Sequence, residues 1–150
     1  MVELDAVDKK IILELLEEPK ASLRSLAASV GIALGTASSR LKSLQDRGII
    51  KGWLVDLDPA AIGWEMTVIV GLRIEKGQMM EVQQQIAADP RVFSVYDVTG
   101  DFDSIAMARV RNREQLNALT KEVFSNEGII RSFTHVVLNT VKESSVVPPF

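Results

Sequence analysis

Residues 22–46 read SLRSLAASVGIALGTASSRLKSLQD, and this pattern predicts two short helices joined at Gly31. Ser22 precedes apolar residues at helical spacing, so its side chain is expected to cap the first helix. Gly31 suits the left-handed conformation that ends a helix, and Ile32 and Leu34 are expected to fill the angle between the two helices. The apolar residues of the first helix are Leu23, Leu26, Ala27 and Val30.

The second of these helices has an outward face that is small, hydroxylated and basic. Ala37, Leu41 and Leu44 recur at i, i+4 and i+7 and form the inner stripe. A protruding helix with such a face suits the DNA major groove, although an ordinary helical hairpin with a solvated face would read similarly. The residues predicted to contact DNA are Arg24, Gly35, Thr36, Ser38, Ser39, Arg40, Lys42 and Ser43.

Charge supports the DNA-binding interpretation. Between Pro19 and Gly52 there are six basic residues and one acid, Asp46, whereas the whole chain has a net charge of −3. A cationic segment on an acidic protein is better explained by a phosphate partner than by chance.

Composition limits the class of protein. The chain has 150 residues and is 47% hydrophobic, which allows one domain or two small ones. No apolar run reaches the length of a membrane span, and the first residues are not signal-like, so we expect a cytoplasmic protein without a membrane partner. With no cysteine and one histidine, cysteine chemistry and a zinc site are not expected, and we predict no cofactor and no catalytic residue.

The segments on either side of residues 22–46 are predicted to support them. Asp5 should cap a helix through Glu18, with its acidic outer face pointing away from DNA. Residues 48–63 are expected to form a short wing or strand and a linker, in which Trp53 packs rather than stacks on a base. The first helix carries an apolar stripe of Ile11, Ile12, Leu15 and Leu16 and an acidic face of Asp8, Glu14, Glu17 and Glu18.

From Glu65 onward the pattern becomes strand, helix, strand, strand, helix, strand. This order predicts a ferredoxin-like βαββαβ domain, so the chain is α+β with an N-terminal helix-turn-helix, winged-helix-like domain. We expect domains at 1–52 and 64–150 with a linker strand or hinge at 53–63. The open face of the sheet, expected to carry Val68, Val70, Thr134 and Val136, should be covered by a second copy of the chain.

Residues 98–103, VTGDFD, lie between the two middle strands. As a bare pattern this is a hairpin turn. Alternatively, exposed N–H groups near Gly100 suit a carboxylate and the nearby acids suit an ammonium group, so the loop would bind a free amino acid. The predicted effector-binding residues are Thr99, Gly100, Asp101 and Asp103, with Ser132 and Thr134 from the last strand.

Two regions together resemble the Lrp/AsnC family, the leucine-responsive and asparagine-operon regulators. The first comprises Leu4-Asp5, Asp8, Ile11, Leu26-Ala27, Val30-Gly31, Arg40, Leu44, Gly48 and Ile50, and the second is the VTGDFD sequence. The resemblance implies a prokaryotic transcription regulator whose dimers associate further, often into octamers, with the amino-acid effector at the contact between dimers near Gly100. Family members often open the recognition helix with Ser-Pro, where this chain has Ala33-Leu34.

Two other functions fit parts of the pattern. A ferredoxin-like domain could be a metabolite-binding or enzymatic module, but the chain lacks a phosphate loop and a G-x-S-x-G turn. His135 is expected to be a packed or surface residue rather than a base. A protein that only assembles would not need the basic segment. We therefore predict binding to double-stranded DNA at a palindromic operator, since a dimer presents two related recognition helices.

Overall fold

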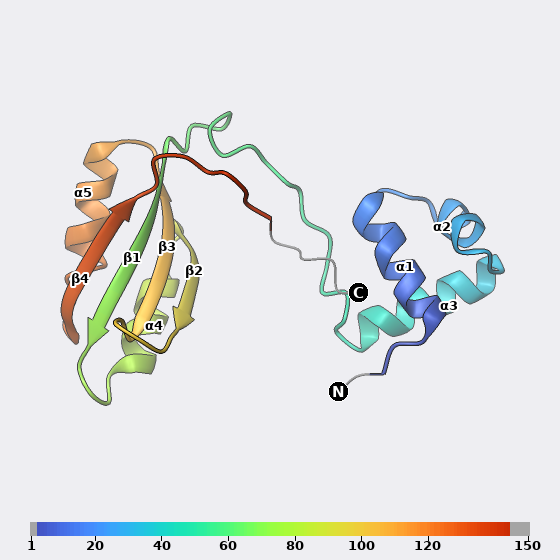
Figure 1. Ribbon diagram of the computed structural model, residues 1–150, viewed down its shortest axis with the longest axis horizontal. Helices are drawn as coiled ribbons and strands as arrows, with labels where there is room; N and C mark the ends of the chain where they lie inside the picture. Colours follow the sequence, from blue (N-terminus) through green and yellow to red (C-terminus); the bar gives the residue numbers. More distant parts are fainter. Residues whose placement is uncertain (1–2, 145–150) are drawn as a thin grey trace. The chain divides into compact units, whose positions relative to one another are not determined.

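The computed structural model describes residues 3–144, so the ends of the predicted domains at 1, 2 and 145–150 lie outside the described residues. The chain divides into two compact units, of which the second comprises Leu57–Glu143. The division falls after Asp56, within the segment 53–63 predicted as a linker. The first unit is helical and the second contains a sheet (Figure 1).

Three helices form the first unit: α1 (Ala6–Glu17), α2 (Leu23–Val30) and α3 (Leu34–Asp46). Asp5 caps α1 by accepting from the Val7 and Asp8 N–H groups, and Ser22 caps α2 by accepting from the Ser25 N–H group. Gly31 ends α2 with a φ of 77°, the left-handed conformation that was predicted for this glycine. Ala33, at the start of α3, has no side-chain oxygen and makes no cap.

The helical unit has a small apolar core in which the largest members are Ile11, Leu15, Leu26 and Leu44. Ile32 packs against this core, as predicted. The prediction for Leu34 is wrong, because that side chain is 47% exposed at the first position of α3. A core of this size leaves the unit sensitive to the loss of any one member.

The linker differs from the prediction. Residues 51–58 form neither helix nor strand, so the predicted wing or strand is absent from this described segment. Trp53 is 52% exposed and Leu54 is 91% exposed, so the predicted packing of Trp53 is wrong. Apolar side chains therefore remain in contact with solvent along this part of the chain.

The second unit is the predicted ferredoxin-like domain. Its strands are β1 (Met66–Ile74), β2 (Val92–Asp97), β3 (Ser104–Val110) and β4 (Ile129–Val136), and its helices are α4 (Met79–Ala87) and α5 (Arg113–Glu122). The sheet is antiparallel in the order β2-β3-β1-β4. The run IIRSFTHVVLNTV, residues 129–141, predicts one long last strand, but β4 ends at Val136.

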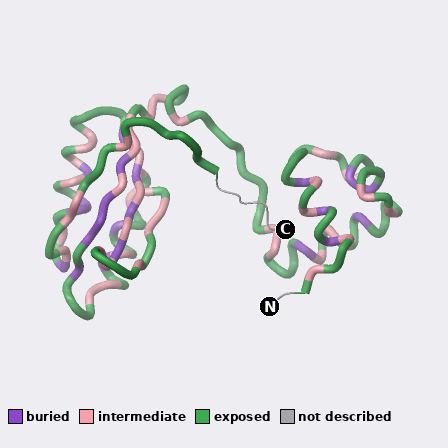
Figure 2. The backbone as a smooth tube through the Cα atoms, viewed as in Figure 1, coloured by how far each residue is buried: buried purple, intermediate pink, exposed green. Residues whose placement is uncertain are grey.

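Both helices lie on one face of the sheet (Figure 1), and the buried residues follow β1, β3 and the inner sides of the helices (Figure 2). Val68 and Val70 belong to this core with Ile86, Leu119 and Phe124, so their assignment to the open face is wrong. Thr134 and Val136 pair with Val70 and Val68, and therefore share the helix-facing side. The open face carries Thr67, Ile69, Gly71, Ile105, Met107, Phe133 and His135.

Candidate DNA-binding and effector sites

The outer side of α3 presents a small polar surface. Gly35, Thr36, Ser38, Ser39 and Lys42 are exposed, and Ser43 is half-buried. The Ser39 hydroxyl donates to the Thr36 carbonyl at 3.2 Å, so it is held close to the helix backbone. Arg24 on α2 is also exposed. Short side chains let a helix approach a duplex closely, which a groove-binding helix requires.

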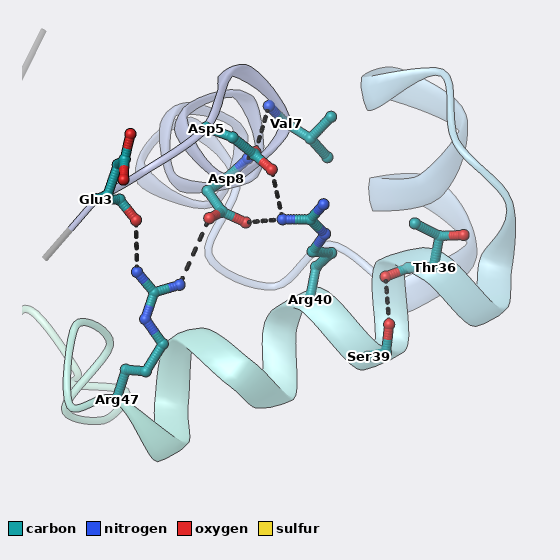
Figure 3. A network of polar contacts seen from close by, with 8 residues as sticks. All are labelled: Glu3, Asp5, Val7, Asp8, Thr36, Ser39, Arg40 and Arg47. Atoms are coloured by element: carbon teal, nitrogen blue, oxygen red, sulfur yellow. Dashed lines mark hydrogen bonds and ion pairs between the residues drawn. The ribbon is translucent and has the colours of Figure 1, made fainter.

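Arg40 is the exception among the predicted DNA contacts. Its Nη1 donates to Asp5 Oδ2 at 2.5 Å and to Asp8 Oδ1 at 3.2 Å, so the guanidinium turns toward the start of α1 (Figure 3). The guanidinium therefore does not project freely outward as predicted, although the Arg40 side chain is still 39% exposed. The physical reason is that two carboxylates lie within its reach, whereas helical periodicity alone ignores the neighbouring helix.

The prediction that Asp8 lies on an exposed acidic face is wrong, because its side chain is only 4% exposed. Arg47, the residue after α3, completes its environment: Nη1 lies 3.6 Å from Asp8 Oδ2, and Nη2 donates to the Glu3 carbonyl at 2.6 Å (Figure 3). A buried carboxylate is expected to be paired, and here both of its oxygens face an arginine.

The electrostatics agree with these contacts. The Asp8 N–H and the Arg40 guanidinium hold the pKa of the Asp5 carboxyl below its ordinary value. The hydrogen bond to Asp5 in turn raises the pKa of Arg40. A sequence signal for this network exists: Asp8, Ile11 and Leu15 share the i, i+3, i+7 spacing of the buried side of α1, so Asp8 needed a cationic partner.

The loop after β2 contains the predicted effector residues. Thr99, Gly100 and Asp101 are exposed, and Gly100 has a φ of 117°, a conformation that favours glycine. The Val98 N–H group donates to the Asp103 carbonyl at 3.2 Å, which closes the loop. Asp97, Val98 and Thr99 line a shallow surface hollow beside it.

Asp103 has partners within the domain. Its Oδ2 accepts from the Ile74 N–H group at 2.9 Å, and its Oδ1 lies 3.5 Å from Arg73 Nη1. Its own N–H group donates to the Leu72 carbonyl at 2.9 Å. These contacts anchor the loop to β1, so Asp101 is the acid of the loop that remains directed to solvent without a hydrogen bond or ion pair among the described residues.

Ser132 and Thr134 were predicted to bind the effector with the loop, but they lie on the side of the sheet opposite to Phe102 of the loop. Phe102 covers Gly71 so closely that a Cβ there would lie 2.7 Å from its ring, and Phe102 contacts Phe133 at a centroid distance of 5.4 Å. Ser132 pairs with Leu72 and Thr134 with Val70, which places both on the opposite side of the sheet. Residues of β4 on the side of Phe102 are Arg131, Phe133 and His135.

Three further features of the described residues 3–144 were compared with these sites: a cavity, possible metal ligands and possible membrane-spanning helices. A cavity of about 350 Å³ is lined in part by Asp58, Trp64, Glu65, Asn139 and Glu143. Within the same residues, no group of three metal-binding side chains comes together. The helices found in this range are all too short or too polar to cross a membrane.

Family comparisons agree with both units. Residues 4–51 match the winged helix-turn-helix DNA-binding domain, and residues 67–147 match the Lrp/AsnC ligand-binding domain. Such a pair of domains defines a DNA-binding transcription regulator that carries a ligand-binding domain. The chain belongs to the Lrp/AsnC family of transcription regulators and is not an enzyme.

Relatives match along the whole chain. An uncharacterised HTH-type transcriptional regulator of Pyrococcus horikoshii is 41% identical over 148 residues, covering 99% of this chain and 100% of its own. The HTH-type transcriptional regulator FL11 of the same organism is 35% identical, covering 98% of this chain and 97% of its own.

Solved structures share the fold. Escherichia coli AsnC has a TM-score of 0.91 at 19% identity, covering 99% of this chain and all of its own. The regulator NMB0573 of Neisseria meningitidis, solved as an L-Met complex, has a TM-score of 0.90 at 23% identity and 97% coverage of both chains.

Proposed function

We propose that the assembly and the DNA affinity of this regulator respond to an amino acid or a related small metabolite. The observation that carries the proposal is the loop around Gly100, which has exposed backbone and a solvent-directed acid, Asp101, in a domain of the ligand-binding class. The structurally similar Neisseria protein, whose structure is a complex with L-Met, supports an amino acid as the class of effector.

In this proposal the effector is held at its two charged ends. Backbone N–H groups near Gly100 receive the carboxylate, and Asp101 receives the ammonium group. Thr99 offers a hydroxyl beside them. Asp103 anchors the loop to Ile74 and Arg73. It therefore affects effector binding by holding the loop in place and not by contacting the effector.

The open face of the sheet supports a homodimer that assembles further. Ile69, Ile105 and Met107 are only half-buried there, and Tyr96 at the edge is exposed. A second copy would cover this apolar surface, and dimers of dimers, up to an octamer, would place the Gly100 loops at new contacts. The dimer would present two copies of α3 to a palindromic operator in the cytoplasm.

A thermal-shift screen with the twenty amino acids tests the effector proposal. A ligand at a hundred times its dissociation constant stabilises the folded state by about 2.7 kcal/mol, which gives a clear rise in Tm. We expect one amino acid or a small chemical group of them to raise the Tm of the sheet domain. If all twenty leave the Tm unchanged at millimolar concentration, a free amino acid is not the effector.

A further inference from the structure

We infer that Asp8 is the positioning residue of the DNA-binding unit: its buried carboxylate holds Arg40 and Arg47 and thereby fixes α3 for contact with DNA. Asp8 is 3% exposed, although it is charged and lies in the first turn of α1. Because its side chain is buried, Asp8 cannot contact DNA directly. Any effect that it has on DNA binding is transmitted through the two arginines.

The geometry is a contact at two points. Arg40 and Arg47 are seven residues apart, which is about two turns or 10.5 Å along a helix, so they project from the same side. Asp8 Oδ1 accepts from Arg40, and Asp8 Oδ2 faces Arg47. The other contacts of the two arginines are Asp5 Oδ2 and the Glu3 carbonyl, which lie in the segment just before α1 (Figure 3).

Two such points add a directional constraint on α3 to the support that the apolar core gives it. Leu44 and Ala37 bury the inner side of the helix, but apolar packing is not directional. Arg40 donates charge-assisted hydrogen bonds to Asp5 and Asp8, and Arg47 donates one to the Glu3 carbonyl and forms an ion pair with Asp8. Such hydrogen bonds are directional, so contacts near both ends of a span of about ten ångströms restrict rotation of α3 about its axis and sliding along α1. Because each Asp8 oxygen faces one arginine, loss of either arginine leaves a buried oxygen without its charged partner.

This assignment also changes which groups face DNA. Of the six basic residues between Pro19 and Gly52, Arg40 and Arg47 are engaged with α1. On α3 itself Lys42 is exposed, on the same side as Gly35 and Ser39, and has no partner among the described residues. In this assignment Arg40 supports DNA binding by holding α3 in place and does not itself contact a base.

The test is a double-mutant cycle of Asp8→Asn and Arg40→Ala, measured by fluorescence anisotropy. The probe is a duplex selected by the wild-type protein from a randomised pool, titrated at several potassium chloride concentrations. Asp8→Asn makes the protein less acidic, which by itself favours DNA. We nevertheless expect each variant to lose about tenfold in affinity, equivalent to about 1.4 kcal/mol, and the double variant to lose no more than either single.

The dependence of affinity on salt separates this role from direct contact. Positioning predicts an unchanged slope of log affinity against log salt for all three variants, at a temperature where circular dichroism shows them folded. A fall of about one in that slope for Arg40→Ala, a loss of selectivity at one base pair, or additive losses would overturn the inference. Unchanged affinity in folded Asp8→Asn would overturn it as well.

A second variant covers the case in which Asp8→Asn does not fold. Arg47→Gln removes the longer of the two Asp8 contacts, together with the hydrogen bond from Arg47 to the Glu3 carbonyl, and leaves the Arg40 pair in place. We expect reduced affinity with the wild-type salt slope for this variant too. Wild-type affinity, or a reduced slope, would assign Arg47 no positioning role and contradict the inference.

Discussion

Leu44→Ala is expected to abolish DNA binding while the sheet domain stays folded. Leu44 is fully buried in the core shared by α1, α2 and α3. Removing a buried leucine side chain costs about 2 to 5 kcal/mol, and a unit of this size has little stability to lose. Because α3 then loses its support, we expect the affinity for DNA to fall by more than about a hundredfold.

Leu34→Ala is the matched control, since Leu34 lies on the same helix but is exposed. We expect this control to keep most of the helical stability and most of the DNA affinity. Calorimetry of Leu44→Ala should show the transition of the sheet domain at its wild-type temperature. Equal losses of DNA affinity in the two leucine variants would contradict the assignment of Leu44 to the supporting core.

Asp101→Ala is expected to remove the effector's influence on assembly and on DNA affinity together. Asp101 is exposed and outside the sheet core, so its loss should leave the fold and effector-free DNA binding nearly intact. Gly100→Val should have the same effect for another reason: a φ of 117° strains any residue that carries a Cβ, so the loop must change shape. Only a ligand with different affinity for two assemblies shifts their populations.

Sedimentation velocity and DNA titration, each with and without the effector found by the thermal screen, measure both responses. Glu127→Ala is the control, because Glu127 is an exposed acid of the same domain in the turn before β4. We expect the control to respond like the wild type. If Asp101→Ala also responds like the wild type, the effector binds elsewhere and the proposed site is wrong.

The sequence predicted the three helices of the first unit and the order of strands and helices in the sheet domain, but it also predicted a wing or strand in the linker that residues 51–58 do not form. Asp5, Ser22 and Gly31 marked helix boundaries that the structure confirms, because capping depends on local chemistry. The alternation of strands and helices likewise predicted the ferredoxin-like topology. Local signals of this kind need no knowledge of distant contacts.

The faces of the sheet were harder to assign. The run from Met66 to Ile74 is apolar on both sides, so its alternation does not say which side meets the helices. Gly71 and Arg73 share one side of the strand, and this is the signal that places Val68 and Val70 on the other. The pairing of Asp8 with two arginines was missed for a related reason, since it joins residues more than thirty positions apart.

Lys42→Glu tests the central claim that the exposed side of α3 contacts DNA. Lys76→Glu is the charge-matched control, because Lys76 is exposed in the sheet domain and its replacement changes the net charge equally. Fluorescence anisotropy with the selected duplex should show a loss of at least about tenfold for Lys42→Glu, with a lower salt slope, and little change for Lys76→Glu. Equal affinities for the two variants would contradict DNA contact through α3.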